Sequence, residues 1–150
     1  MADEQKAKRL EIAHVLFIDI VGYSKLLTNE QRERQQELNR IVRDTEPFRA
    51  AEADGKLVRI PTGDGMVLAF FTKPDAPARC AMAISRALHG TTHLPLRMGI
   101  HSGPVELVED VNDKANLAGT GVNIAQRVMD CGDAGHILLS ARAAYVRAVR

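Results

Sequence analysis

The feature that most constrains the fold is a short apolar run from His14 to Ile20, in which Asp19 is the only acid. A run of this kind, bounded by a glycine, is typical of a buried strand. Gly22 follows and interrupts the pattern. The sequence therefore predicts a buried β-strand that ends in a carboxylate.

Helical and strand-like spacings alternate along the rest of the chain. The predicted helices cover about residues 28–53, 75–88, 121–129 and 141–149, and the predicted strands cover 56–61, 66–71, 96–100, 105–108 and 136–139. An irregular polar loop is expected before the helix that starts at Gly121. This order predicts an α/β fold, an α+β sandwich with a ferredoxin-like βαββαβ core and an additional C-terminal strand and helix.

Composition narrows the class of protein. The 150 residues are 45% hydrophobic, which fits one domain with its own core. With 20 basic and 19 acidic residues the net charge is +1, and only 4% of residues are aromatic, so no nucleic-acid or membrane partner is expected. The charged start lacks an apolar signal segment, and Cys80 and Cys131 have apolar neighbours. These features predict a cytoplasmic domain with small, buried, unpaired cysteines.

A second acid, Asp64, stands in the segment TGDG (62–65) between two strand-like runs. An Asp-Gly pair in this setting predicts a tight hairpin, because Gly65 would accept the positive φ of the turn. If the strands are neighbours, Asp19 and Asp64 reach one edge of the sheet. Two hard oxygen ligands with room for phosphate and water suit Mg²⁺ or Mn²⁺ rather than zinc. Taken singly, each acid is equally well explained as a strand-end or turn residue.

The segment Gly22-Tyr23-Ser24 leads from the strand into a helical region. Backbone N–H groups at a helix start are free and carry partial positive charge, so they can receive phosphate. Many strand-to-helix turns share this pattern, and alone it is weak evidence.

Asn123 and Arg127 are spaced i, i+4 on a predicted helix and share one face. An amide can hydrogen-bond a ribose oxygen, and a guanidinium can bind a phosphate through two donors. An isolated pair of this spacing is more often a solvated helix face.

Four segments, taken together and in order, favour the functional over the structural interpretation of these residues. They are FIDIVGYS (17–24), TGD (62–64), RMGIHSG (97–103) and GVNIAQR (121–127). Together they closely resemble the ordered motifs of class III adenylate and guanylate cyclases. The resemblance runs from about Glu11 to the end and so covers nearly the whole chain.

The resemblance implies a metal and phosphate site. Asp19 and Asp64 match the two metal-binding aspartates of the family, and the backbone carbonyl of Ile20 matches a further ligand. Two Mg²⁺ or Mn²⁺ ions are then expected, about 4 Å apart. Arg97 matches an arginine that contacts the phosphates.

Asn123 and Arg127 match the family pair that orients the ribose and stabilises the pentavalent phosphorus. In this family one catalytic domain supplies the metal aspartates and another supplies this pair. The resemblance therefore implies a head-to-tail homodimer with two equivalent sites. The expected reaction is attack of the ribose 3′-hydroxyl on the α-phosphorus of ATP, or less favourably GTP, with pyrophosphate leaving. His101 is expected to be structural.

Two departures from the family pattern concern the base. Adenylate cyclases of this family usually carry a purine-reading lysine where this chain has Ile60, and aspartate or threonine where it has Asn116. Lys56 shares a strand face with Ile60 but lies about 13 Å away, which is too far to replace the missing lysine. Arg59 is predicted to point to the opposite face. An asparagine amide both donates and accepts, so Asn116 can read either purine.

A third departure concerns the end of the chain. The family fold normally continues with a strand pair that carries a phosphate-binding lysine, whereas this sequence ends at Arg150. We expect residues 1–10 to form a charged lead-in and residues 11–150 to form the cyclase homology domain without its last strands.

Two other classes of function fit parts of the pattern. A non-catalytic nucleotide-binding or dimerisation module is favoured by Ile60, Asn116 and the missing strands. It is disfavoured because the metal, phosphate and transition-state positions all hold suitable side chains. A diguanylate-cyclase-like or polymerase-palm enzyme also sets two carboxylates on a related sheet, but this chain lacks a Gly-Gly-Asp/Glu-Glu-Phe segment.

Overall fold

The computed structural model describes residues 8–109 and 115–148. Its elements are β1 (Lys8–Ile20), the short 3₁₀ helix η2 (Tyr23–Lys25), α1 (Thr28–Arg43), α2 (Glu46–Ala53), β2 (Leu57–Pro61), β3 (Gly65–Phe70), α3 (Ala76–Ala87), β4 (Leu96–Glu109), β5 (Ala115–Ala118), α4 (Thr120–Asp130), β6 (Ile137–Leu139) and α5 (Ala141–Ala148).

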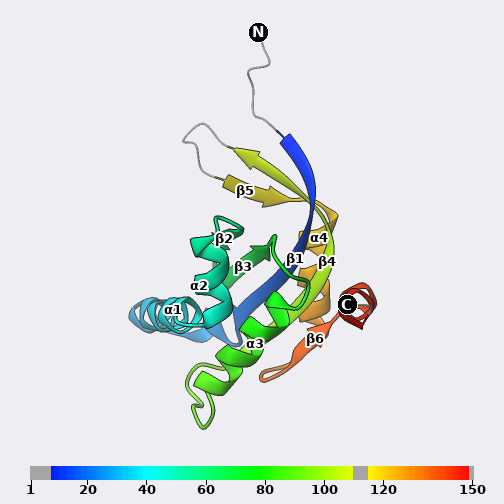
Figure 1. The fold of residues 1–150 in the computed structure, drawn as a ribbon. Helices are drawn as coiled ribbons and strands as arrows, with labels where there is room; N and C mark the ends of the chain where they lie inside the picture. The colour runs from blue at the N-terminus through cyan, green and yellow to red at the C-terminus, as the bar shows by residue number, and fades with distance from the viewer. Residues whose placement is uncertain (1–7, 110–114, 149–150) are drawn as a thin grey trace.

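The strands form one sheet with the order β2-β3-β1-β4-β5, and β6 pairs with β4 (Figure 1). The pairs along this path are antiparallel, and the β4–β6 pair is parallel. The first strand along the chain therefore lies in the middle, between β3 and β4. This arrangement, with helices between β1 and β2 and between β3 and β4, confirms the predicted ferredoxin-like core. The further C-terminal strand and helix are confirmed as β6 and α5.

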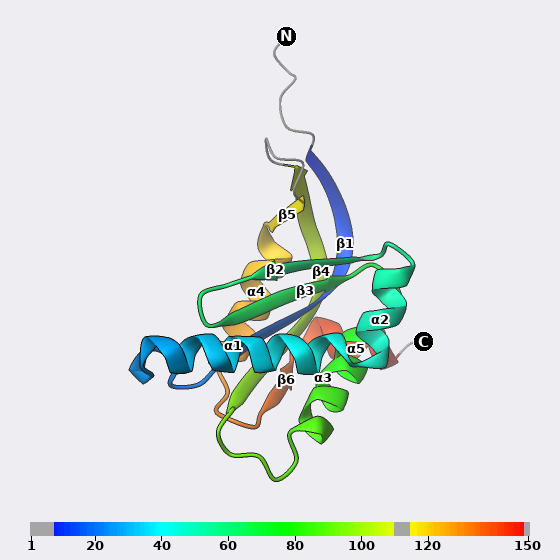
Figure 2. The same ribbon diagram turned by 90° about the vertical axis from the view of Figure 1, so that its left-hand side faces the viewer.

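Side chains alternate between the two faces of β1, and each face has its own apolar cluster. Leu16 and Ile18 pack with residues of α1, α2 and α3, whereas Val15 and Phe17 pack with residues of α4. Figures 1 and 2 show α1, α2 and α3 together on one side of the sheet and α4 on the other. Because Asp19 continues the series of Val15 and Phe17, it lies on the α4 face.

The prediction of two separate strands, over residues 96–100 and 105–108 on either side of Ser102-Gly103-Pro104, is wrong. Residues 96–109 form one strand, β4, which pairs with β1 from Leu96 to Val108, and Pro104 lies opposite Ile12. On the other side, β4 pairs with β6 at residues 98–100 and with β5 at 106–109. Pro104 lies between these two partners, where its missing N–H group costs no strand pairing with either. The strand β5 lies where an irregular loop was expected.

Two further expectations need correction. The helix predicted over residues 28–53 is divided into α1 and α2, because Thr45 is extended (ψ 146°) and Pro47 in the first turn of α2 cannot donate a helical hydrogen bond. Cys80 is buried, and burial raises the pKa of its thiol to about 11. Cys131, however, is exposed, against the prediction, while both thiols are free.

None of the helices in the described ranges has the length and apolar character that crossing a bilayer requires.

Candidate active site

A cavity of about 240 Å³ opens where β1 ends. Its walls come from the end of β1 and the turn after it, the β2–β3 hairpin, β4 and the loop after α4. The lining residues are Asp19, Ile20, Val21, Gly22, Tyr23, Ser24, Asp64, Arg97, Gly132 and Asp133. The fold thus brings together every residue predicted to bind metal or phosphate.

Strand register places Arg97 of β4 directly opposite Asp19 of β1. Arg97 Nε donates to Asp19 Oδ1 at 2.9 Å, and Arg97 Nη2 donates to Asp19 Oδ2 at 3.1 Å. This two-donor contact is the strongest geometry for a guanidinium and a carboxylate. The hydrogen bonds to Asp19 raise the pKa of Arg97. Asp19 is itself 5% exposed, so its negative charge is balanced inside the fold.

Asp64 reaches the cavity because β3 passes unusually close to β1. Gly65, the first residue of β3, lies opposite Asp19. A Cβ atom on Gly65 would collide with the carbonyl oxygen of Ile18 and lie 2.7 Å from the Cα of Asp19. Gly65 is not among the glycines with positive φ. The predicted hairpin is present, but the predicted reason for this glycine is wrong: the position needs a glycine for close strand approach.

The pKa of Asp64 is raised because its carboxyl group is partly buried and lies near Asp19. Burial and then the charge of Asp19 raise the pKa of Asp64, while a backbone hydrogen bond and Arg97 oppose the shift. Two carboxylates that share a cavity repel each other, and a bound cation would relieve that repulsion.

The turn after β1 is tighter than the sequence predicted. Gly22 has a φ of 77°, and the short helix η2 follows before α1 begins at Thr28. The N–H groups that start a helical turn have no partner within it. Gly22, Tyr23 and Ser24 all line the cavity, so this turn borders the space between the two aspartates.

The donor set fits hard divalent cations. Within residues 8–109 and 115–148, no group of three or more His, Cys, Asp or Glu side chains is arranged to hold a metal ion. A site of two carboxylates is therefore an open one, with coordination positions left for a backbone carbonyl, water and phosphate oxygens. Mg²⁺ and Mn²⁺ prefer such oxygen sites, whereas structural zinc prefers a closed set of four ligands.

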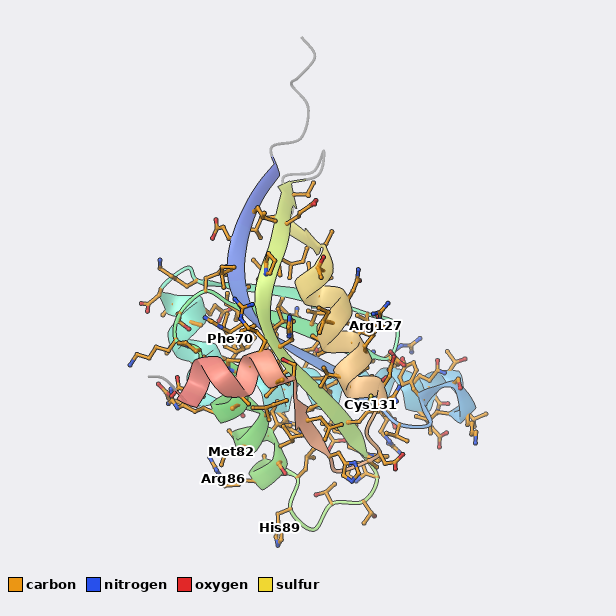
Figure 3. All side chains as sticks on the ribbon, turned by 90° about the vertical axis from the view of Figure 1, so that its right-hand side faces the viewer. Phe70, Met82, Arg86, His89, Arg127 and Cys131 are labelled. Atoms are coloured by element: carbon orange, nitrogen blue, oxygen red, sulfur yellow. The ribbon has the colours of Figure 1, made fainter. Side chains whose placement is uncertain are left out.

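We call Asp19, Asp64 and Arg97 the carboxylate half-site, and Asn123 and Arg127 the helix half-site. Both residues of the helix half-site are exposed on α4, and neither lines the cavity. Figure 3 shows Arg127 on α4 and Cys131 where that helix ends. Within one chain the structure therefore does not bring the two half-sites together.

The remaining predicted positions lie away from the cavity. Ile60 is half-buried and packs against the apolar cluster on the α4 face. Arg59 points to the opposite face, where its Nη1 donates to Asn39 Oδ1 of α1 at 3.4 Å. Asn116 lies in β5, where its backbone pairs with that of Val108 in β4. His101 is buried, and its ring hydrogen-bonds Ser140 at the start of α5, which is consistent with a structural role.

Sequence reasoning missed three residues near the cavity. Gly132 and Asp133 line it, and Asp130, the last residue of α4, forms an ion pair with Arg97 at 3.2 Å. The only local signal was an acid at a helix end, which says nothing about a partner on β4.

Comparison with known proteins gives consistent results. The family model described as the adenylate and guanylate cyclase catalytic domain matches residues 5–148. The chain is 30% identical over 147 residues to a Rhizobium meliloti protein named "Putative adenylate cyclase 3". The aligned region covers 93% of this chain and 24% of that protein. The chain thus spans about a quarter of the length of this relative.

Two solved structures share the fold. The adenylate/guanylate cyclase/hydrolase of Silicibacter pomeroyi has a TM-score of 0.69 at 25% identity, covering 96% of this chain and 84% of that one. The guanylate cyclase domain of RhGC from Catenaria anguillulae, solved in complex with GTP, has a TM-score of 0.71 at 23% identity, covering 92% and 83%. These matches confirm the resemblance carried by the four sequence segments. The chain belongs to the class III adenylate and guanylate cyclase catalytic domain family.

Proposed function

We propose that this domain is an adenylate cyclase that converts ATP to 3′,5′-cyclic AMP and pyrophosphate, with GTP as the alternative substrate. We place catalysis in residues 11–150, at two equivalent sites of a head-to-tail homodimer. The observation that carries the proposal is the division of the predicted machinery. The carboxylate half-site meets in one cavity, whereas the helix half-site is exposed on a different surface of the same chain.

The carboxylate half-site would hold the metal ions and the triphosphate. Asp19, Asp64 and the carbonyl of Ile20 are the proposed ligands of two Mg²⁺ or Mn²⁺ ions. When bound, such ions make the attacking hydroxyl more acidic and neutralise phosphate charge. The N–H groups of residues 22–24 and the guanidinium of Arg97 would bind phosphate oxygens.

The helix half-site would act on the ribose and on the reacting phosphorus. In the proposed reaction a bond forms between the ribose 3′-oxygen and the α-phosphorus, while the bond from that phosphorus to the departing pyrophosphate breaks. Asn123 would orient the ribose and Arg127 would stabilise the added negative charge. Two copies of the chain related by a twofold axis place the same pair of surfaces in contact twice, which accounts for two equivalent sites.

The choice of base rests on Ile60 and Asn116. Ile60 has no polar atom in its side chain and packs against an apolar cluster, so it cannot supply the hydrogen bond of the usual lysine. We assign base reading mainly to Asn116, whose amide both donates and accepts. The name of the Rhizobium meliloti relative supports ATP. The complex of the Catenaria anguillulae domain with GTP supports the alternative.

The test is product formation by the purified domain at high concentration with Mn²⁺, supplied separately with ATP and with GTP. Cyclic AMP and cyclic GMP are quantified beside an Asp64→Asn control. Cyclic AMP that is absent from the control would support the proposal, and cyclic GMP alone would reassign the base. No product from either nucleotide would contradict the proposal for this domain.

A further inference from the structure

We propose that Asp130 is a positioning residue for Arg97: it holds the guanidinium after a divalent cation takes the carboxylate of Asp19. Asp130 would thereby set how strongly Arg97 competes with the cation. The inference rests on the metal site of the proposed function and adds a residue that neither the sequence segments nor that proposal assign.

The first step is the geometry around Arg97. Its Nε and Nη2 donate to the two oxygens of Asp19 at 2.9 and 3.1 Å. Its Nη2 also lies 3.2 Å from Asp130 Oδ1. One nitrogen thus contacts two acids, one at the end of β1 and the other at the end of α4. A small movement of the side chain can therefore pass the guanidinium from one acid to the other.

The second step is competition for Asp19. Arg97 donates to both carboxylate oxygens, so a cation that binds Asp19 competes with the guanidinium for the same negative charge and favours its displacement. A guanidinium does not lose its proton in proteins, so it stays positive after displacement. A positive group beside a divalent cation is repelled unless another anion receives it.

The third step is the choice of that anion. Asp64 is unsuitable because it is the other proposed metal ligand. Asp133 lines the cavity but forms no ion pair with Arg97. Asp130 already contacts the guanidinium, and its side chain is 50% exposed, so it can shift without disturbing the core.

The position of Asp130 in α4 also indicates that its ion pair with Arg97 stabilises the fold. It is the last residue of α4, and the C-terminal end of a helix carries partial negative charge. An acid is unfavourable there by itself. The ion pair with Arg97 offsets that cost and fixes the end of α4 to β4.

The experiment measures binding of Mn²⁺ to the nucleotide-free protein, with free Mn²⁺ followed by electron paramagnetic resonance. Four proteins form a double-mutant cycle: wild type, Arg97→Gln, Asp130→Asn and the double variant. Arg97→Gln should tighten Mn²⁺ binding and Asp130→Asn should weaken it, each by roughly tenfold, because charged groups in contact couple at this level. In the Arg97→Gln background, Asp130→Asn should change the affinity by less than about twofold.

Two control variants separate this role from simpler ones. Asp133→Asn removes the same charge from the rim of the same cavity without touching Arg97, and should leave the affinity nearly unchanged. Asp130→Glu keeps the carboxylate and should bind Mn²⁺ like the wild type. Circular dichroism establishes that each variant keeps its helix content.

The outcomes are distinguishable. Equal weakening by Asp130→Asn in both backgrounds would show a direct effect of its charge on the cation and would overturn the inference, as would no weakening at all. Failure of Asp130→Glu to restore binding would also overturn it. If the wild type binds no Mn²⁺, or if Asp64→Asn binds it equally well, the proposed metal site itself is wrong. Binding that requires Asp64, without coupling between residues 97 and 130, would overturn this inference alone.

Discussion

Asp19 is 5% exposed and has both carboxylate oxygens bonded to Arg97, whereas Asn123 and Arg127 are exposed and bond to no other side chain in the described ranges. The carboxylate half-site is therefore organised by the chain's own sheet. The helix half-site lies on an exposed face of α4. The contrast agrees with the proposed homodimer, in which the carboxylate half-site of one chain would face the helix half-site of the other.

Substitutions in the two half-sites are also expected to differ in their effect on folding stability. Asp19 and Arg97 are paired across two central strands, so removing one leaves the other unbalanced and partly buried. Among the residues that the structure describes, Asn123 and Arg127 have no such side-chain partner to lose. Variants of the helix half-site are expected to change activity without changing the fold, and the predictions below use this difference.

The largest expected effect is on turnover in Asp64→Asn. We expect a loss of at least about 10³-fold, since even one transition-state hydrogen bond contributes 10²- to 10³-fold. The melting temperature should be unchanged or slightly higher. The pKa of Asp64 is raised in the fold by burial and by Asp19, so at neutral pH the ionised form opposes folding and a neutral amide does not. Cyclase assays and thermal denaturation check this together. Turnover close to that of the wild type would remove Asp64 from the metal site.

Asn123→Ala should lose activity by about 10²-fold or more, with an unchanged melting temperature, because the residue is exposed. Mixed with Asp64→Asn, it should regain up to about a quarter of wild-type activity. Random mixing makes half of the dimers mixed, and each of these has one intact site of two. Measuring cyclic AMP across mixing ratios checks the division of the half-sites. A mixture as inactive as its components would mean that both half-sites serve one site within a subunit.

Gly65→Ala should destabilise the fold by about 1–3 kcal/mol, the usual cost of forcing an extra group into a packed position. The added Cβ would collide with the backbone of β1 next to Asp19, so the carboxylate half-site should lose metal affinity as well. Gly63→Ala is the matched control in the same hairpin, since nothing lies within 4 Å of its added Cβ. Urea denaturation and Mn²⁺ titration compare the two. Equal behaviour would contradict the close approach of β3 to β1.

The smallest expected effect is a pH dependence of folding stability that comes from His101, which lies outside the cavity. Burial, and then the charge of Arg142, lower the pKa of His101 from 6.5. The fold therefore favours neutral His101, and the unfolded chain binds more protons as the pH falls. This contribution to stability should be fully present above about pH 6.5 and should decrease as the pH falls towards the folded-state pKa.

His101→Asn is the variant that checks this prediction. An asparagine amide carries both an acceptor and a donor, so it can keep a hydrogen bond to the hydroxyl of Ser140, and it does not titrate. Melting temperatures from pH 5 to 8 should fall by a few degrees more for the wild type than for this variant as the pH is lowered. Parallel curves would show that another group carries the pH dependence.

Much of the proposed site could be predicted from the sequence because its residues lie in short segments with local signals. The apolar run of β1 fixed the place of Asp19, the hairpin pattern fixed that of Asp64, and helical spacing put Asn123 and Arg127 on one face. The order of these segments carried the family resemblance. Local patterns failed where the structure depends on distant neighbours, as at Pro104, which falls between two predicted strands and in the sheet lies within β4.

By itself the sequence determined the order of most core elements, the family and the residues proposed for both half-sites, because periodicity and motifs are properties of neighbours along the chain. Only the tertiary structure decided that Arg97 faces Asp19, from which it is separated by 78 residues, that Gly65 serves strand approach, and that Asp130 reaches Arg97. It also decided that the two half-sites lie apart. These features follow from strand register and from the packing of α4 on the sheet, and no local pattern of residues encodes either one.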